Sequence, residues 1–166
     1  MYMVNGGTGR NSGTITVGAS DVSNELFSVG MAAGYIGDKT TAATTGAIEN
    51  NGTINVNGEY SIGMYGAQSG TTVTNNKDIV LNASNTTGIY VENNAKAVNN
   101  GSIRTGASGL SNVTGVVLGS GSTLTNNGTI NISGTASKGA LLKGGTIANY
   151  GTITVSGAGS KETDSL

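Results

Sequence analysis

A short pattern of hydrophobic and polar positions recurs along the chain and is clearest at residues 126–134, which read Asn-Asn-Gly-Thr-Ile-Asn-Ile-Ser-Gly. Asn and Gly tolerate a positive φ and favour a turn, whereas Ile or Val at alternate positions fall on one face of a strand. Each copy therefore predicts a turn followed by a short strand. Close copies begin at Asn11, Asn50 and Asn149, and weaker copies begin at Asn75 and Asn99.

The spacing of these copies indicates a repeat of about 25 residues. The first apolar residues of the predicted strands are Ile15, Ile54, Ile79, Ile103, Ile130 and Ile153, at intervals of 39, 25, 24, 27 and 23 residues. Two further apolar columns keep the same spacing. One contains Ile48, Val73, Ala97, Leu124 and Ile147, and the other contains Met31, Met64, Ile89, Val116 and Ala140. Each repeat thus predicts three short strands.

The long first interval predicts two insertions within an otherwise ordinary repeat. They fall near residues 19–24 and 34–45, and a smaller insertion falls near residues 106–113. Insertions in stacked repeats lie at corners and can carry binding, but uncharged loops rich in Thr and Ala are more often plain connections. We therefore expect loops at these three places.

Three strands in about 25 residues favour a stacked parallel β-structure. Helical repeats need longer units with a 3.6-residue period, the spacing of leucine-rich repeats is missing, and propeller blades need about 40 residues. We predict an all-β, single-stranded, right-handed parallel β-helix (a β-solenoid) of about six coils. Residues 1–159 are expected to form the solenoid, and residues 160–166 are expected to form a polar tail without a further strand.

Alternation along the strands predicts which side chains enter the core. The expected inward set is Ile54, Val56, Ile79, Leu81, Ile130, Ile132, Ile153 and Val155, with Ile62, Met64, Val91, Leu118 and Leu142 from the following strand. The turn asparagines share this inward parity. We predict that Asn50, Asn75, Asn99, Asn126 and Asn149 form a stacked Asn ladder, because an unpaired buried amide costs roughly 1 to 3 kcal/mol and stacking satisfies it. This ladder is structural rather than catalytic.

Composition narrows the range of partners. The chain has 166 residues, 10% charged residues and a formal net charge of −1, so it has no basic surface for nucleic acid or anionic lipid. No apolar stretch approaches 18 residues, and residues 1–10 lack the basic end and hydrophobic segment of a signal peptide. We expect no nucleic-acid partner and no membrane insertion of this segment.

Candidate chemistry is sparse. The chain has no Cys and no His, which excludes catalytic triads and thiolate metal sites. Its acidic residues rarely share a column, whereas solenoid lyases and glycosidases need several carboxylates on adjacent coils. We therefore expect no catalytic residue, no metal ligand and no cofactor. Outward Thr residues also suggest an ice-binding face, but Asp78, Val80 and Arg104 interrupt the array.

One outward column stands apart. If Met64, Ile89, Val116 and Ala140 point inward, then Tyr65, Tyr90, Val117 and Leu141 point outward on successive coils. This column either stabilises the sheet or lies under neighbouring structure, or it forms a binding platform for sugars or a protein. We retain it as the possible ligand-binding surface.

The six copies of the Asn-x-Gly-Thr-Ile type, four of them exact, with Gly-Met-Tyr at residues 63–65 and Gly-Ile-Tyr at residues 88–90, resemble the passenger domain of a bacterial autotransporter (type V secretion) adhesin. The resemblance covers nearly the whole chain, although its motifs describe architecture better than activity. It implies a location on the cell surface, displayed from the outer membrane, and a role in adhesion to a glycan or protein of a host or bacterial surface.

Two classes of function follow. The first is a structural and adhesive solenoid that binds a surface through many weak contacts. The alternative is a polysaccharide-active, pectate-lyase-like enzyme, which would need the missing column of acids and bases. Met1-Tyr2 falls at the same place in a coil as Met64-Tyr65, so we also expect a piece of a longer solenoid. Its uncapped ends predict end-to-end self-association.

Overall fold

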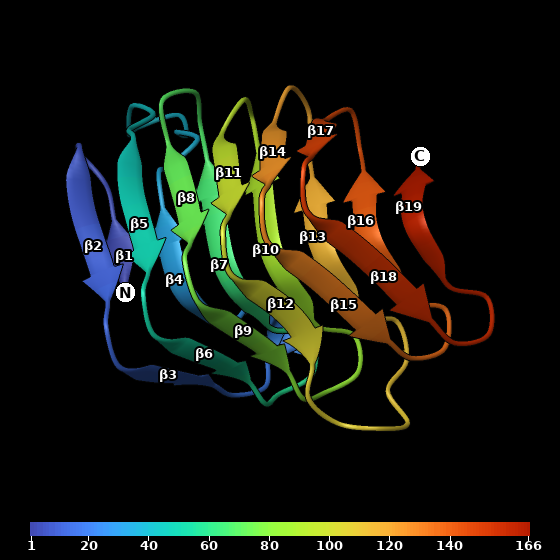
Figure 1. Cartoon of the computed structure of the whole chain (residues 1–166). Helices are drawn as coiled ribbons and strands as arrows, with labels where there is room; N and C mark the ends of the chain where they lie inside the picture. Colours follow the sequence, from blue (N-terminus) through green and yellow to red (C-terminus); the bar gives the residue numbers. More distant parts are fainter.

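The chain folds into a parallel β-solenoid, as the repeat predicts (Figure 1). The computed structural model describes all 166 residues. Nineteen strands form three sheets in which every strand pair is parallel, and the two termini lie at opposite ends of the stack. Each coil contributes one strand to each sheet. None of the helical segments is long and apolar enough to cross a membrane.

Successive strands along the chain belong in turn to the first, second and third sheet. The seven-stranded sheet contains β1 (Tyr2–Met3), β4 (Val29–Ala33), β7 (Ile62–Ala67), β10 (Thr87–Glu92), β13 (Thr114–Leu118), β16 (Lys138–Leu142) and β19 (Lys161–Ser165). The second sheet contains β2 (Gly7–Asn11), β5 (Gly46–Asn50), β8 (Thr72–Asn75), β11 (Lys96–Asn99), β14 (Thr123–Asn126) and β17 (Thr146–Asn149). The third sheet contains β3 (Thr14–Val17), β6 (Thr53–Val56), β9 (Asp78–Leu81), β12 (Ser102–Thr105), β15 (Thr129–Ser133) and β18 (Thr152–Ser156).

The core is a narrow column of aliphatic side chains between the three sheets. Ile54, Ile79, Ile103 and Ile130 stack in register on the third sheet, and each is fully buried. Their equivalents in the first and last coils, Ile15 and Ile153, are only partly buried because one neighbour is missing. Burial of such a side chain contributes about 1.5 to 3 kcal/mol, so the middle coils hold most of the hydrophobic stabilisation.

The prediction that Ile62 enters the core is wrong, and a column of glycines explains why. Gly63 and Met64 are both buried, so the alternation shifts and Ile62 lies on the outer face, half-buried, instead of in the core. A Cβ on Gly63 would lie 2.7 Å from the Gly88 carbonyl oxygen and 3.0 Å from Ile79 Cγ2. Because no side chain fits there, Gly63 takes the inward position that parity assigned to Ile62. Equivalent glycines precede the inward residue in β4, β10, β13 and β16.

The C-terminal residues also differ from expectation. Lys161–Ser165 form strand β19, which pairs with β16, so this segment adds a polar strand to the seven-stranded sheet rather than remaining outside it as a tail. Pairing needs only backbone groups, and Asp164 adds bonds to Lys161 (2.7 Å) and Lys138 (3.9 Å). The sequence did not predict this strand because residues 161–165 show no apolar alternation. Backbone pairing with the edge of β16 forms it instead.

The turn asparagines form a continuous hydrogen-bonded stack at the corner between the second and third sheets. Each side-chain Nδ2 donates to the Oδ1 of the next coil at 2.7–2.8 Å, in the order Asn11, Asn50, Asn75, Asn99, Asn126 and Asn149. The four middle members are completely buried. The structure thus brings all five predicted residues into one Asn ladder and adds Asn11 to it.

A second amide stack, which the sequence reasoning missed, lies one residue further along each turn. Asn127 donates to Asn100, Asn100 to Asn76, and Asn76 to Asn51, each at 2.8 Å. We call these four residues the outer ladder. Its members are exposed or half-buried, and its hydrogen bonds run toward the N-terminus, opposite to those of the Asn ladder. The two columns therefore present opposing amide dipoles side by side.

Candidate binding surface

A column of mostly apolar side chains runs along the outer face of the seven-stranded sheet. Its members are in register on successive strands: Tyr2, Ala32, Tyr65, Tyr90, Val117 and Leu141. We call these six residues the aromatic strip. The predicted equivalence of Tyr2 with Tyr65 is confirmed by this register. The strip brings together the four residues proposed from parity and extends them by two coils.

The four proposed residues differ in how much surface they offer. Tyr65 and Tyr90 are half-buried, and their ring centroids lie 5.7 Å apart at an interplanar angle of 49°. Leu141 is also half-buried, but Val117 is only 8% exposed. Tilted aromatic pairs at this separation attract each other, so the two tyrosines form one preorganised unit. Val117 can add little contact surface and acts mainly as part of the sheet.

A hollow of about 380 Å³ lies beside the tyrosine pair. Its lining is Phe27, Val29, Ile62, Tyr65, Tyr90 and Glu92. We call it the tyrosine hollow. Sequence reasoning found only the two tyrosines in this set. Ile62 was predicted to lie in the core, and Phe27 lies just beyond an insertion that was expected to be a plain loop.

The first insertion presents Phe27 to this hollow. Asp21 and Leu26 exchange two backbone hydrogen bonds of 2.9 Å, which close a small loop around the 3₁₀ turn η1 (Val22–Asn24). Ser28 ties the loop to the coil by donating from its hydroxyl to the Ala19 carbonyl at 2.9 Å. Phe27 follows this closed loop directly and is 62% exposed. It is the sole Phe of the chain and belongs to no repeated column, so alternation does not place it at the hollow.

One carboxylate joins the two tyrosines. Glu92, the last residue of β10, accepts a hydrogen bond from the Tyr65 hydroxyl on one oxygen and from the Tyr90 hydroxyl on the other, the latter at 3.3 Å. Burial, with the hydrogen bond to Glu92 as the next cause, raises the pKa of Tyr65. Burial and the charge of Glu92 also raise the pKa of Tyr90. Both phenols therefore stay neutral and remain donors across physiological pH, which fixes their hydroxyl ends.

The lining of this hollow has an uneven charge. Glu92 is its only charged residue, no Lys or Arg lines it, and Glu92 forms no ion pair. Positive side chains on this face lie further along the stack, where Lys138 and Lys161 approach Asp164. The site is thus apolar and aromatic with a single negative group that is not neutralised.

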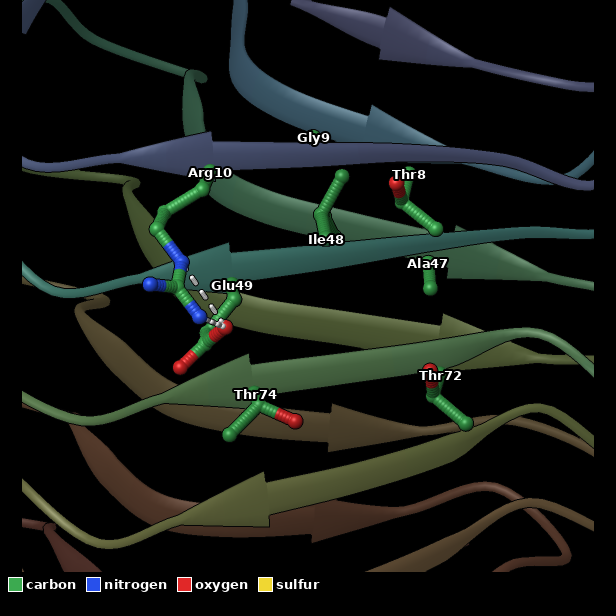
Figure 2. Close-up of a pocket in the computed structure, with 8 residues that line it drawn as sticks. All are labelled: Thr8, Gly9, Arg10, Ala47, Ile48, Glu49, Thr72 and Thr74. Atoms are coloured by element: carbon green, nitrogen blue, oxygen red, sulfur yellow. Dashed lines mark hydrogen bonds and ion pairs between the residues drawn. The ribbon is translucent and has the colours of Figure 1, made fainter.

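Two other hollows have a different character. A hollow of about 370 Å³ lies on the second sheet. There the side chain of Arg10 in β2 reaches the Glu49 carboxylate of the neighbouring strand β5 at 2.8 Å (Figure 2). Its remaining polar side chains are Thr residues, and the ion pair satisfies both charges. A smaller hollow of about 260 Å³ lies at the N-terminal end of the aromatic strip, between Tyr2 and Tyr35 of the second insertion.

Acidic residues are dispersed over the surface. In the strand register Glu49 lies beside Arg10 and Thr74, Asp78 beside Thr53 and Ser102, and Asp164 beside Leu141. No group of three or more His, Cys, Asp or Glu side chains is close enough together to hold a metal ion.

Comparison with known proteins places the chain in a family. Residues 1–90 match the family model described as the BigA third pectate lyase-like domain, and this is more than half of the 166 residues. The chain belongs to this family. The part that matches this BigA domain includes both long insertions, Phe27 and the two tyrosines of the hollow. No curated protein and no solved structure matches the chain.

Proposed function

We propose that this β-helix of the BigA third pectate lyase-like domain family is a structural and adhesive segment of an autotransporter-like surface adhesin. In this role it attaches to a glycan or protein on a host or bacterial surface. The observation that carries the proposal is the aromatic strip, an apolar column on the open face of a sheet. Aromatic patches of this kind mark interaction sites, and BigA itself is a bacterial surface adhesin-like protein.

The strip suits attachment for a physical reason. The solenoid holds equivalent residues one coil apart, so a rigid row of weak contacts faces a partner at once. Several weak contacts that engage together give an avidity well above that of each contact. The low charge of the chain removes a competing attraction to nucleic acid and anionic lipid. A location on the cell surface is part of this proposal.

Attachment of the purified chain to a glycan array and to cultured host cells tests the proposal. We expect binding that the double substitution Tyr65→Ser/Tyr90→Ser reduces at least tenfold while the circular dichroism spectrum is unchanged. The matched control is Tyr60→Ser/Tyr150→Ser, which removes two exposed tyrosines outside the strip and should leave binding intact. Equal loss in both double variants would contradict a role of the strip.

We also propose that the chain is not an enzyme. The dispersed carboxylates and the lack of His and Cys support this, because polysaccharide lyases and hydrolases need neighbouring acid and base groups. Incubation with acidic and neutral polysaccharides should give no new reducing ends and no unsaturated products. Clear turnover would favour the pectate-lyase-like alternative instead.

We further propose that the isolated chain associates end to end. The outer edges of β2 and β3 at one end, and of β17 and β18 at the other, are unpaired in the sheet order and can template further strands. Analytical ultracentrifugation should show concentration-dependent association. A monomer that melts cooperatively, with amide protection reaching Ile15 and Ile153, would contradict it.

A further inference from the structure

The chemistry of the tyrosine hollow restricts what it can bind. Small-molecule sites are concave and mostly apolar, with a few polar groups that orient the ligand, and they begin at about 300 Å³. The hollow has this size, three aromatic rings and one carboxylate. A sugar would require several polar partners for its hydroxyl groups. Here Glu92 is the only charged acceptor, and two phenols already bond to it.

The charge of the hollow points to a cation. Glu92 carries a negative charge among Phe27, Val29 and Ile62, and no basic side chain lines the site to neutralise it. An anionic ligand would meet this carboxylate without a compensating positive group. A cation, in contrast, is attracted both by the carboxylate and by the faces of aromatic rings.

The apolar lining selects among cations. A compact ammonium ion or a metal ion is strongly hydrated, and the hollow offers too few oxygen ligands to replace its water. A quaternary ammonium group spreads its charge over methyl groups, which lose little on leaving water and pack against aliphatic and aromatic carbon. Aromatic residues with a nearby carboxylate suit such a group.

We propose that the tyrosine hollow binds a quaternary ammonium group of the choline type, between Phe27 and the tyrosine pair, with Glu92 supplying the opposite charge. Glu92 has a second role in this site, because its two hydrogen bonds hold the hydroxyl ends of Tyr65 and Tyr90 and fix the rings. The inference deepens the proposed function and rests on it for the use of this face in attachment.

Choline chloride and 3,3-dimethyl-1-butanol, its uncharged isostere, provide a matched pair of probes. The full chain labelled with ¹⁵N is titrated with each, and the amide signals of residues lining the hollow are followed. We expect choline to shift these signals in a saturable manner and the isostere to bind roughly 3- to 30-fold more weakly, which is the range of a cation–π contribution. Equal binding of the two probes would overturn charge recognition.

Substitutions locate the binding within the hollow. Phe27→Ala should weaken choline binding about tenfold, whereas Leu26→Ala should not change it. These neighbours are matched, since Leu26 is 64% and Phe27 is 62% exposed, but only Phe27 lines the hollow. Glu92→Gln should weaken choline binding more than it weakens binding of the isostere, because only choline loses an opposite charge. Equal effects of the Phe27 and Leu26 substitutions would overturn the site.

Further ligands separate this inference from the proposed function. A methyl glycoside of a neutral hexose that shifts the same signals more strongly than choline would overturn the choice of ligand. Phosphatidylcholine vesicles and soluble choline distinguish a lipid headgroup from a free ligand, and binding to either supports the inference. If the hollow binds no choline but the tyrosine-dependent attachment persists, the inference fails and the adhesive function stands. If choline binds the hollow but the chain attaches to no surface, the adhesive function fails and the inference stands.

Discussion

The Asn ladder and the aromatic strip are both columns of equivalent residues placed one coil apart. In the ladder every middle side chain is fully buried and bonded on both sides, so repetition satisfies polar groups that the core would otherwise leave unpaired. In the strip the side chains are mostly half-buried and retain surface toward solvent. The same coil spacing thus serves stability at the corner and accessibility on the sheet.

The largest expected effect comes from breaking the buried column. Asn126→Ala should lower the free energy of unfolding by about 2 to 3 kcal/mol, because the buried Nδ2 of Asn99 loses its acceptor. The control is Asn131→Ala, an exposed asparagine in β15 that should change stability by less than about 0.5 kcal/mol. Chemical denaturation measures both. Similar midpoints for the two variants would show that the ladder does not stabilise the fold.

A smaller effect on stability is expected from the strip. Tyr65→Ser/Tyr90→Ser should cost about 1 kcal/mol, because the substitution removes one tilted aromatic pair and partly buried ring surface but leaves the backbone ladder intact. Thermal and denaturant unfolding give the value. A loss larger than that of Asn126→Ala would assign the column a structural role instead of a binding role.

The outer ladder separates hydrogen bonding from burial. Asn100 donates and accepts at 2.8 Å, as the buried asparagines do, yet it is exposed. Asn100→Ala should therefore change the free energy of unfolding by only about 0.5 kcal/mol, since water replaces the lost partners. A cost equal to that of Asn126→Ala would show that the stacking itself, rather than burial, is what stabilises both columns.

The smallest effect concerns pH and the loop before Phe27. Hydrogen bonds from Ser23 and then Asn24 lower the pKa of Asp21. A lowered folded-state pKa means that the contribution of Asp21 is present above its unfolded pKa of about 3.9 and is lost as pH falls toward the lowered value. Amide signals of residues 21–27 should therefore shift only in acid. The same acid transition in Asp21→Asn would exclude Asp21 as its cause.

Much of this architecture could be predicted from the sequence because one repeat unit encodes it several times. Ile54, Ile79, Ile103 and Ile130 define the core face, and the turn asparagines define the corner, since alternation and turn chemistry are local properties. The six copies therefore predicted the three sheets and the stacked asparagines together.

The binding hollow could be predicted only in part because it depends on two non-repeating features. Gly63 interrupts simple alternation through its contact with the next coil, so parity placed Ile62 on the wrong face. Phe27 reaches the hollow through an insertion whose closure depends on bonds between Asp21 and Leu26. Glu92 accepts hydrogen bonds from Tyr90 on its own strand and from Tyr65 on the preceding coil. The contact with Tyr65 becomes visible only when the coils are stacked.

The direction of the Asn ladder gives the solenoid a polarity. From Asn11 to Asn126 every ladder Nδ2 donates toward the C-terminal end. In the first two turns the backbone N–H of Gly13 or Gly52 holds this orientation by donating to Asn11 Oδ1 at 3.1 Å or Asn50 Oδ1 at 3.3 Å. The stack therefore ends in a free Nδ2 donor at Asn149 and begins with the Oδ1 of Asn11. A coil added at either end, from the same chain or from another copy, continues the Asn ladder only in head-to-tail orientation. Two identical ends brought together would oppose donor to donor or acceptor to acceptor. The corner asparagines therefore determine the direction in which further coils can be added.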